Sequence, residues 1–149
     1  MEKDLIWMQY AIQLAETAAR HNEVPVGAVL IQDEQIIGEG WNRPISLHDP
    51  SAHAEIIALR DAATKIKNYR LVNSTLYVTL EPCIMCVGAL VHARVQRVVF
   101  GAPDPKTGAV QSVFQFGETQ KLNHQIQYTG GVMTEQCGAL LKIFFKSRR

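Results

Sequence analysis

The feature that most constrains the fold of this chain is an alternation of short apolar runs with longer segments whose apolar residues recur at helical spacing. The first two runs flank Gln32-Asp33-Glu34, a polar turn that predicts a β-hairpin. After it, helical segments separate most of the strands, and such crossover connections join parallel strands. We therefore expect an α/β fold with a mixed, partly parallel sheet covered by helices on both faces. The predicted strands are residues 26–31, 35–41, 75–80, 97–101 and 125–128, and the predicted helices are residues 4–20, 53–67, 84–93 and 133–145.

Length and composition indicate one domain of ordinary size. The 149 residues are 47% hydrophobic and 19% charged, and no internal repeat, low-complexity tract or linker interrupts them. These values are typical of a soluble globular protein and exclude a disordered chain, a collagen-like repeat and a coiled coil. We therefore expect a single domain over residues 1–149.

The charge and hydropathy patterns restrict the partners and the compartment. The net charge of +1 gives the molecule no strong overall field, so a nucleic acid would have to bind at a local basic patch. The N-terminus has no secretory leader, and no window approaches the ~20 apolar residues that a membrane-spanning helix needs. The three cysteines are an odd number, which argues against a disulfide framework. We expect a cytoplasmic protein without a membrane segment.

Two of the cysteines stand close together, and with a histidine they form a candidate metal site. His53 begins one predicted helix, and Cys83 and Cys86 begin another. Three good ligands with a fourth position left for water are typical of a catalytic zinc site, whereas a structural site uses four protein ligands. The start of a helix lowers the pKa of both thiols, which favours the thiolates that bind zinc.

Glu55 follows His53 by two positions, and in mid-helix two such side chains point apart. Both can face one cleft only if His53 lies at the helix entry, where Ser51 is the expected cap. Glu55 would then stand beside the zinc-bound water without ligating the metal. Because zinc brings the pKa of its water toward ~7, Glu55 is placed to accept that proton and hand it on.

Neither motif is specific by itself. A Cys-x-x-Cys pair is often a structural zinc knuckle or a redox pair, and His-Ala-Glu alone carries little information. Together, with Pro82 directly before Cys83, they form the signature of zinc nucleobase deaminases, in which the glutamate is the general acid/base. A redox protein is the weakest alternative, because proline stands before the cysteine pair and not within it.

The segments around these motifs resemble a narrower group, the bacterial tRNA-specific adenosine deaminases (TadA family) of the cytidine deaminase-like superfamily. The resemblance spans nearly the whole chain and is densest in residues 23–29, 38–44, 48–55, 68–71, 76–83 and 98–102, with shorter matches at residues 104, 106–109 and 123–124. It implies a three-layer α/β/α cytidine deaminase-like fold with a central five-stranded sheet, and a homodimer with one Zn2+ in each subunit.

The same resemblance implies the reaction, which is hydrolytic deamination of adenosine to inosine at the wobble position (34) of a tRNA anticodon stem-loop. An arginine tRNA is the expected substrate. In such a reaction activated water attacks C6 of adenine, Glu55 passes a proton to the ring, and ammonia leaves. An anticodon loop offers unstacked bases, so extruding the target base costs little there.

The resemblance also assigns residues to the substrate. Asn42 would read a purine edge, and backbone groups around Ala54 would help to hold the base. Asp104 and Lys106 would lie beside the RNA strand. From the residues alone, Asn42 and the loop that contains Asp104 are typical of turns.

The C-terminal segment is basic and aromatic. Its last eight residues contain four basic side chains, two phenylalanines and no acidic residue. Such a tail is usually a solvated helix end, although basic residues interleaved with aromatics also suit phosphates and an unstacked base. Given the resemblance, we expect RNA contacts from Phe145, Lys146 and Arg149.

Two further alternatives remain open. A deaminase of a free base or nucleotide, of guanine or cytosine type, needs the same activated water, so the zinc site does not distinguish it from an RNA deaminase. The basic aromatic tail and residues 104–109 favour RNA, because a free base would not require them. A non-catalytic zinc-bound partner subunit would be expected to lack the proton shuttle, and Glu55 is present.

Overall fold

The computed structural model describes residues 2–148, in which five strands form one sheet. The strands are β1 (Gly27–Gln32), β2 (Gln35–Trp41), β3 (Ser74–Leu80), β4 (Arg97–Ala102) and β5 (Gln127–Thr129). The helices are α1 (Glu2–Arg20), α2 (Pro44–Leu47), α3 (Ala54–Ile66), α4 (Ile84–His92) and α5 (Thr134–Lys146). The sheet order is β2-β1-β3-β4-β5. β1 is antiparallel to β2 and β3, whereas β3, β4 and β5 are parallel, which confirms the predicted mixed sheet.

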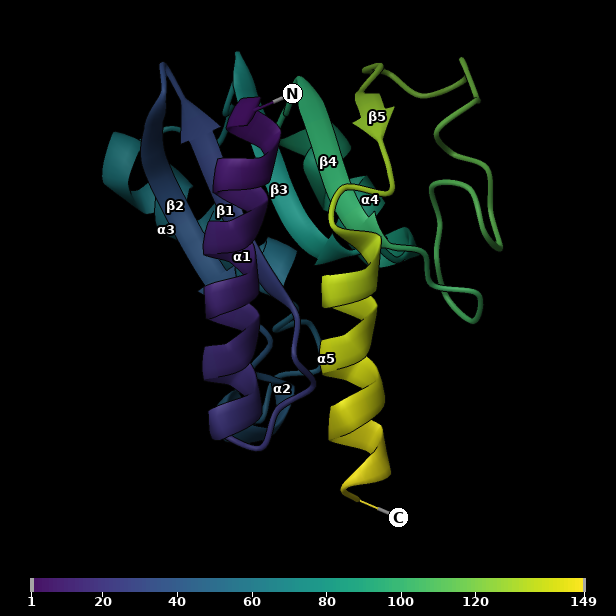
Figure 1. Ribbon diagram of the computed structural model, residues 1–149. Coiled ribbons are helices and arrows are strands. Elements are labelled where there is room, and N and C mark those ends of the chain that lie inside the picture. The colour runs from purple at the N-terminus through teal and green to yellow at the C-terminus, as the bar shows by residue number, and fades with distance from the viewer. Residues whose placement is uncertain (1, 149) are drawn as a thin grey trace.

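Helices cover both faces of the sheet (Figure 1). α1 and α5 lie over one face, where Met8 and Cys137 are buried with Val29 of β1. α3 and α4 lie over the other face, where the next residue of β1, Leu30, is buried in a second cluster. Neighbouring residues of a strand point to opposite faces, so β1 contributes to both cores. The expected three-layer α/β/α architecture is confirmed.

Two glycines on β2 allow α3 to pack unusually close to the sheet. A Cβ atom at Gly40 would lie 2.7 Å from the backbone oxygen of Ala54, and one at Gly38 would lie 2.5 Å from that of Ala58. Any side chain at either position would push the helix away from the strand. The glycines therefore determine where the first turn of α3 lies.

Asp4 binds α1 to the sheet, on the face opposite α3 and α4. Its buried carboxylate accepts hydrogen bonds from Arg97 Nη1 at 2.9 Å, from Arg97 Nη2 at 2.8 Å and from the Tyr77 hydroxyl at 2.8 Å. The hydrogen bonds from Arg97 outweigh the effect of burial and lower the pKa of Asp4. This ion pair joins the first turn of α1 to β4, away from the cysteine pair.

The observed elements differ from the predicted ones at a few places. The four-residue helix α2 lies between the predicted strand 35–41 and the predicted helix 53–67, where no element was predicted, and Pro44 stands in its first turn. β5 begins at Gln127, two residues later than predicted, and it pairs only with β4. Within the described residues, no helix combines the length and the apolar character needed to cross a bilayer.

Candidate active site

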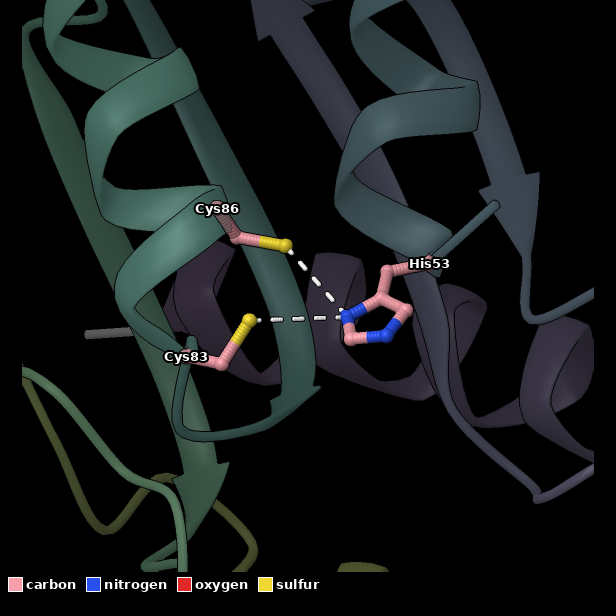
Figure 2. A group of neighbouring side chains, drawn as sticks. All are labelled: His53, Cys83 and Cys86. Atoms are coloured by element: carbon pink, nitrogen blue, oxygen red, sulfur yellow. Dashed lines mark hydrogen bonds between the residues drawn. The ribbon is translucent and has the colours of Figure 1, made fainter. Parts of the chain in front are cut away.

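The three predicted metal ligands lie at the beginnings of two helices on the same face of the sheet. His53 immediately precedes α3 and Cys83 immediately precedes α4, and both have extended backbone conformations. Cys86 lies in the first turn of α4. Figure 2 shows the imidazole of His53 facing both sulfur atoms across the space between the two helices. The fold thus brings together residues that are 30 positions or more apart.

The distances between the ligand atoms fit a tetrahedral zinc ion. His53 Nδ1 lies 3.5 Å from Cys83 Sγ and 3.6 Å from Cys86 Sγ, and all three ligand atoms are within 4.8 Å of one another. Zinc binds sulfur at about 2.3 Å and nitrogen at about 2.0–2.1 Å, so a tetrahedral ion separates the two atom types by about 3.5 Å. The three side chains can therefore bind one ion with little rearrangement.

The ionisation of the two thiols is unequal. A hydrogen bond from the Cys86 thiol, together with the neighbouring His53, lowers the pKa of Cys83 to about 4. The same hydrogen bond and burial raise the pKa of Cys86. The Cys83 thiol therefore ionises more readily than the Cys86 thiol. A metal ion that binds both sulfur atoms displaces the remaining thiol proton, because zinc is bound by thiolates.

Glu55 lies in the first turn of α3, is 4% exposed and does not belong to the metal-binding group. Burial raises the pKa of Glu55 to about 7, against the opposing effect of the nearby His53. A carboxyl group of this pKa can both accept and donate a proton near neutral pH. Its position at the helix entry, two residues after a ligand, agrees with the predicted one.

Asn42, and not Ser51, fixes the beginning of α3. The side-chain oxygen of Asn42 accepts a hydrogen bond from the backbone N–H of Ala54 at 2.9 Å. The hydroxyl of Ser51 instead donates to Asp49, so the predicted cap is wrong. The actual cap comes from a residue at the end of β2 that is distant in sequence, and it holds the turn between His53 and Glu55. Asn42 and Ala54, both predicted to contact the base, are thus in direct contact with each other.

The predicted RNA-contacting residues gather around one cavity, apart from Arg149, which lies outside the described residues. The cavity has a volume of about 800 Å³, and its lining includes Asp104, Lys106, Phe145 and Lys146. It lies between the loop that follows β4 and the C-terminal half of α5. The fold therefore brings the loop after β4 and the helix α5 together, although they are far apart in the sequence.

Asp104 is also engaged within its own loop. One carboxylate oxygen accepts the backbone N–H groups of Lys106 at 3.0 Å and Thr107 at 3.2 Å, and the other accepts the Thr107 hydroxyl at 2.7 Å. These contacts shape a turn, which is the role that residue type alone suggested. Lys106, two positions after Asp104, is among the residues that line the cavity.

Sequence reasoning missed two residues at the site. Lys142 lines the same cavity as Lys146, one helical turn away on α5. Glu81 is the second, and its buried carboxylate holds the loop that contains Asp104. The available signal was its place directly before Pro82 and Cys83, because an acidic residue at a buried strand end needs partners.

Comparisons with known proteins extend this result. A model of the cytidine and deoxycytidylate deaminase zinc-binding region matches residues 1–102. A tRNA-specific adenosine deaminase of Haemophilus influenzae is 56% identical over 149 residues, covering 99% of this chain and 86% of the relative. One of Bacillus subtilis is 41% identical over 149 residues, covering 100% of this chain and 92% of the relative. A solved structure from work on A-to-I editing by tRNA deaminases at the wobble position of transfer RNA has a TM-score of 0.87 and 39% identity, covering 91% of this chain and 98% of that one.

The matched zinc-binding region contains His53, Cys83 and Cys86, and zinc is therefore the metal cofactor. The likeness to the relatives covers both sides of these ligands, including the helix α5 that lies beyond the matched region. Because the likeness extends over nearly the whole of this chain and of its relatives, and not only over the metal site, the chain is an enzyme of the tRNA-specific adenosine deaminase family.

Proposed function

We propose that this enzyme converts adenosine to inosine at wobble position 34 of a tRNA anticodon in the cytoplasm, with an arginine tRNA as substrate. The observation that carries the proposal is the cavity beside α5, which Phe145 and three lysines line: Lys106, Lys142 and Lys146. An unstacked base can stack on an aromatic ring, and lysines neutralise phosphates. The cavity therefore suits a single RNA strand better than a free base. The names of the relatives support the same substrate class.

In this proposal Glu55 moves the proton. Zinc, when bound by the two cysteines and His53, supplies a water molecule of lowered pKa at its remaining position. Glu55 accepts the proton of that water and returns it to the purine ring. Because Glu55 is buried, its carboxyl group has little contact with bulk water. The net reaction adds one water and releases ammonia, so it requires no oxidant and no second cofactor.

Asn42 is the proposed contact to the purine. Its side-chain oxygen is occupied by the N–H of Ala54, so the amide presents its NH2 group, a donor, to the base. A ring nitrogen of adenine is an acceptor and can receive this hydrogen bond. Ala54 contributes through the backbone that Asn42 holds in place. The two residues would then orient the base over the metal site as a unit.

The test of the function is a deamination assay on a synthetic anticodon stem-loop of arginine tRNA with adenosine at position 34. We expect inosine to form, while guanine and cytidine at the same concentration remain unreacted. Lys146→Ala should raise KM for the stem-loop. It should also reduce the slope of log KM against log salt concentration by the amount that corresponds to about one phosphate contact. Deamination of guanine or cytidine with no reaction of the stem-loop would support the alternative, a deaminase of a free base or nucleotide.

We infer further that two copies of the chain associate through α4. Ile84 is 53% exposed on this helix, and it borders a cavity of about 400 Å³ together with Gly88, Val91 and Phe116. Exposed apolar surface of this kind on a helix is typical of a protein interface. A second copy is the proposed occupant, because the resemblance of the sequence to the tRNA-specific adenosine deaminases carries the expectation of a homodimer.

Gly88→Arg should abolish the association. Apart from its chain neighbours and the nearby backbone of its own helix, no heavy atom lies within 4 Å of a Cβ atom at Gly88, so the monomer accommodates a side chain there, whereas a packed partner would not. Sedimentation equilibrium should show a dimer for the wild type and a monomer for this variant. Gln13→Arg adds the same charge on the exposed side of α1 and should remain dimeric. A wild-type monomer at every concentration would contradict the inference.

A further inference from the structure

Glu81 is a buried carboxylate at the junction between the sheet and the metal site. It is 2% exposed and stands between the last residue of β3 and Pro82. Its two oxygen atoms accept hydrogen bonds from four backbone N–H groups and one hydroxyl. The backbone donors are Asp104 at 3.0 Å, Val110 at 3.1 Å, Gln111 at 2.9 Å and Ser112 at 3.0 Å, and the hydroxyl belongs to Ser112.

These donors come from both ends of one loop, which we call the 103–112 loop. Asp104 lies at the beginning of the loop, and the other donors lie at its end. The segment between them contains Lys106, which lines the cavity beside α5. A single carboxylate therefore holds together the two ends of the segment that presents this lysine.

The 103–112 loop is also joined to the segment that carries a metal ligand. Gly108 pairs with Cys83 in an isolated antiparallel bridge, and the N–H of Ala109 donates to the carbonyl of Pro82 at 2.8 Å. A Cβ atom at Gly108 would lie 2.5 Å from a carboxylate oxygen of Glu81, so the loop is closely wrapped around this side chain. The position of the loop relative to the metal site is thus determined at Glu81 and Pro82.

We propose that Glu81 is a positioning residue for the RNA substrate. It fixes the position of the 103–112 loop relative to Cys83, so that Lys106 contacts the RNA strand bound in the cavity. This inference rests on the proposed function. Glu81 belongs neither to the metal-binding group nor to the residues that line the cavity, and it reaches the cavity through the hydrogen bond that it accepts from Asp104. Its effect is therefore on substrate binding, while the chemical step at the metal proceeds from an intact ligand set.

The chemistry of the site requires a carboxylate. Five donors converge on two oxygen atoms, and an ionised carboxylate only accepts hydrogen bonds. In Glu81→Gln an NH2 group replaces one carboxylate oxygen. This group is itself a hydrogen-bond donor, so the backbone N–H groups that faced the lost oxygen have no acceptor. Ser112→Ala is the milder change, because it removes only the hydroxyl and retains all the backbone donors.

The experiment measures KM and kcat on the anticodon stem-loop, together with zinc per chain. For Glu81→Gln we expect KM to rise about tenfold or more, with kcat within about threefold of wild type and one zinc per chain retained. Ser112→Ala should raise KM about two- to fivefold, which reflects the loss of one hydrogen bond. Asp4→Asn is the matched control, because it also neutralises a buried carboxylate but lies at α1, and it should lower stability while KM stays unchanged.

The outcomes separate this inference from the proposed function. Wild-type protein that leaves the stem-loop unreacted would overturn the proposed function, and the role of Glu81 with it. If the wild type is active and both variants have an unchanged KM, only the role of Glu81 is overturned. A loss of zinc and of kcat at constant KM would also overturn it, since Glu81 would then support the metal ligands. Ser112→Ala decides the matter if Glu81→Gln does not fold.

Discussion

Glu55→Gln should lower kcat for deamination of the stem-loop by about 10²–10⁴-fold, the range that general acid–base catalysis contributes. Glutamine has the size of glutamate, but it cannot accept a proton from the attacking water or deliver one to the ring. The side chain is buried at the first turn of α3 and is separate from the metal-binding group, so the ligands remain as they are. Zinc content should therefore stay at one ion per chain.

Zinc analysis and RNA binding accompany the kinetic measurement of this variant. Binding of the stem-loop, measured by fluorescence anisotropy, should match that of the wild type, because the cavity beside α5 does not include Glu55. The variant is then a protein that binds metal and substrate and lacks only the proton transfer. Activity within tenfold of wild type would show that another group carries the proton.

The fold and the metal ligands could be predicted because local spacing encodes them. Cys83 and Cys86 are separated by less than one helical turn, and β1 to β4 are apolar runs or alternating segments of six or seven residues. His53 has no such local partner. What indicates its role is that it stands at a predicted helix start, as the cysteine pair does. The connections from β2 to β3 through α3 and from β3 to β4 through α4 then bring the two helix starts to one side of the sheet.

Polar contacts between distant segments could not be predicted in this way. The cap of α3 was expected from Ser51, the nearest candidate in sequence, but Asn42 supplies it from twelve positions before Ala54. Glu81 likewise finds its donors 23 to 31 positions away. Such hydrogen bonds depend on where the chain returns after a loop, and neither periodicity nor residue type contains that information. Helix α2 was missed for another reason, since four residues are too few to show a period.

Replacement of Cys86, the buried metal ligand, is the most severe test of the metal site. Cys86 is fully buried, and its sulfur lies 3.6 Å from His53 Nδ1. In Cys86→Ser the hydroxyl is shorter and does not ionise near neutral pH, so only two of the three ligands remain effective. We expect the affinity for zinc to fall by more than about 100-fold, because even the loss of groups behind the ligands costs 10–100-fold. Deamination should fall to background.

The third cysteine supplies the matched control for this change. Cys137 is equally buried, but it lies on α5 in the core on the opposite face of the sheet, and burial alone raises its pKa to about 12. A thiol in that state is a packing group, so Cys137→Ala should retain one zinc per chain and wild-type kcat, with some loss of stability. A chelator should inactivate the wild type and added zinc should restore it. Full activity in Cys86→Ser, or in chelated wild type, would contradict a catalytic metal held by His53, Cys83 and Cys86.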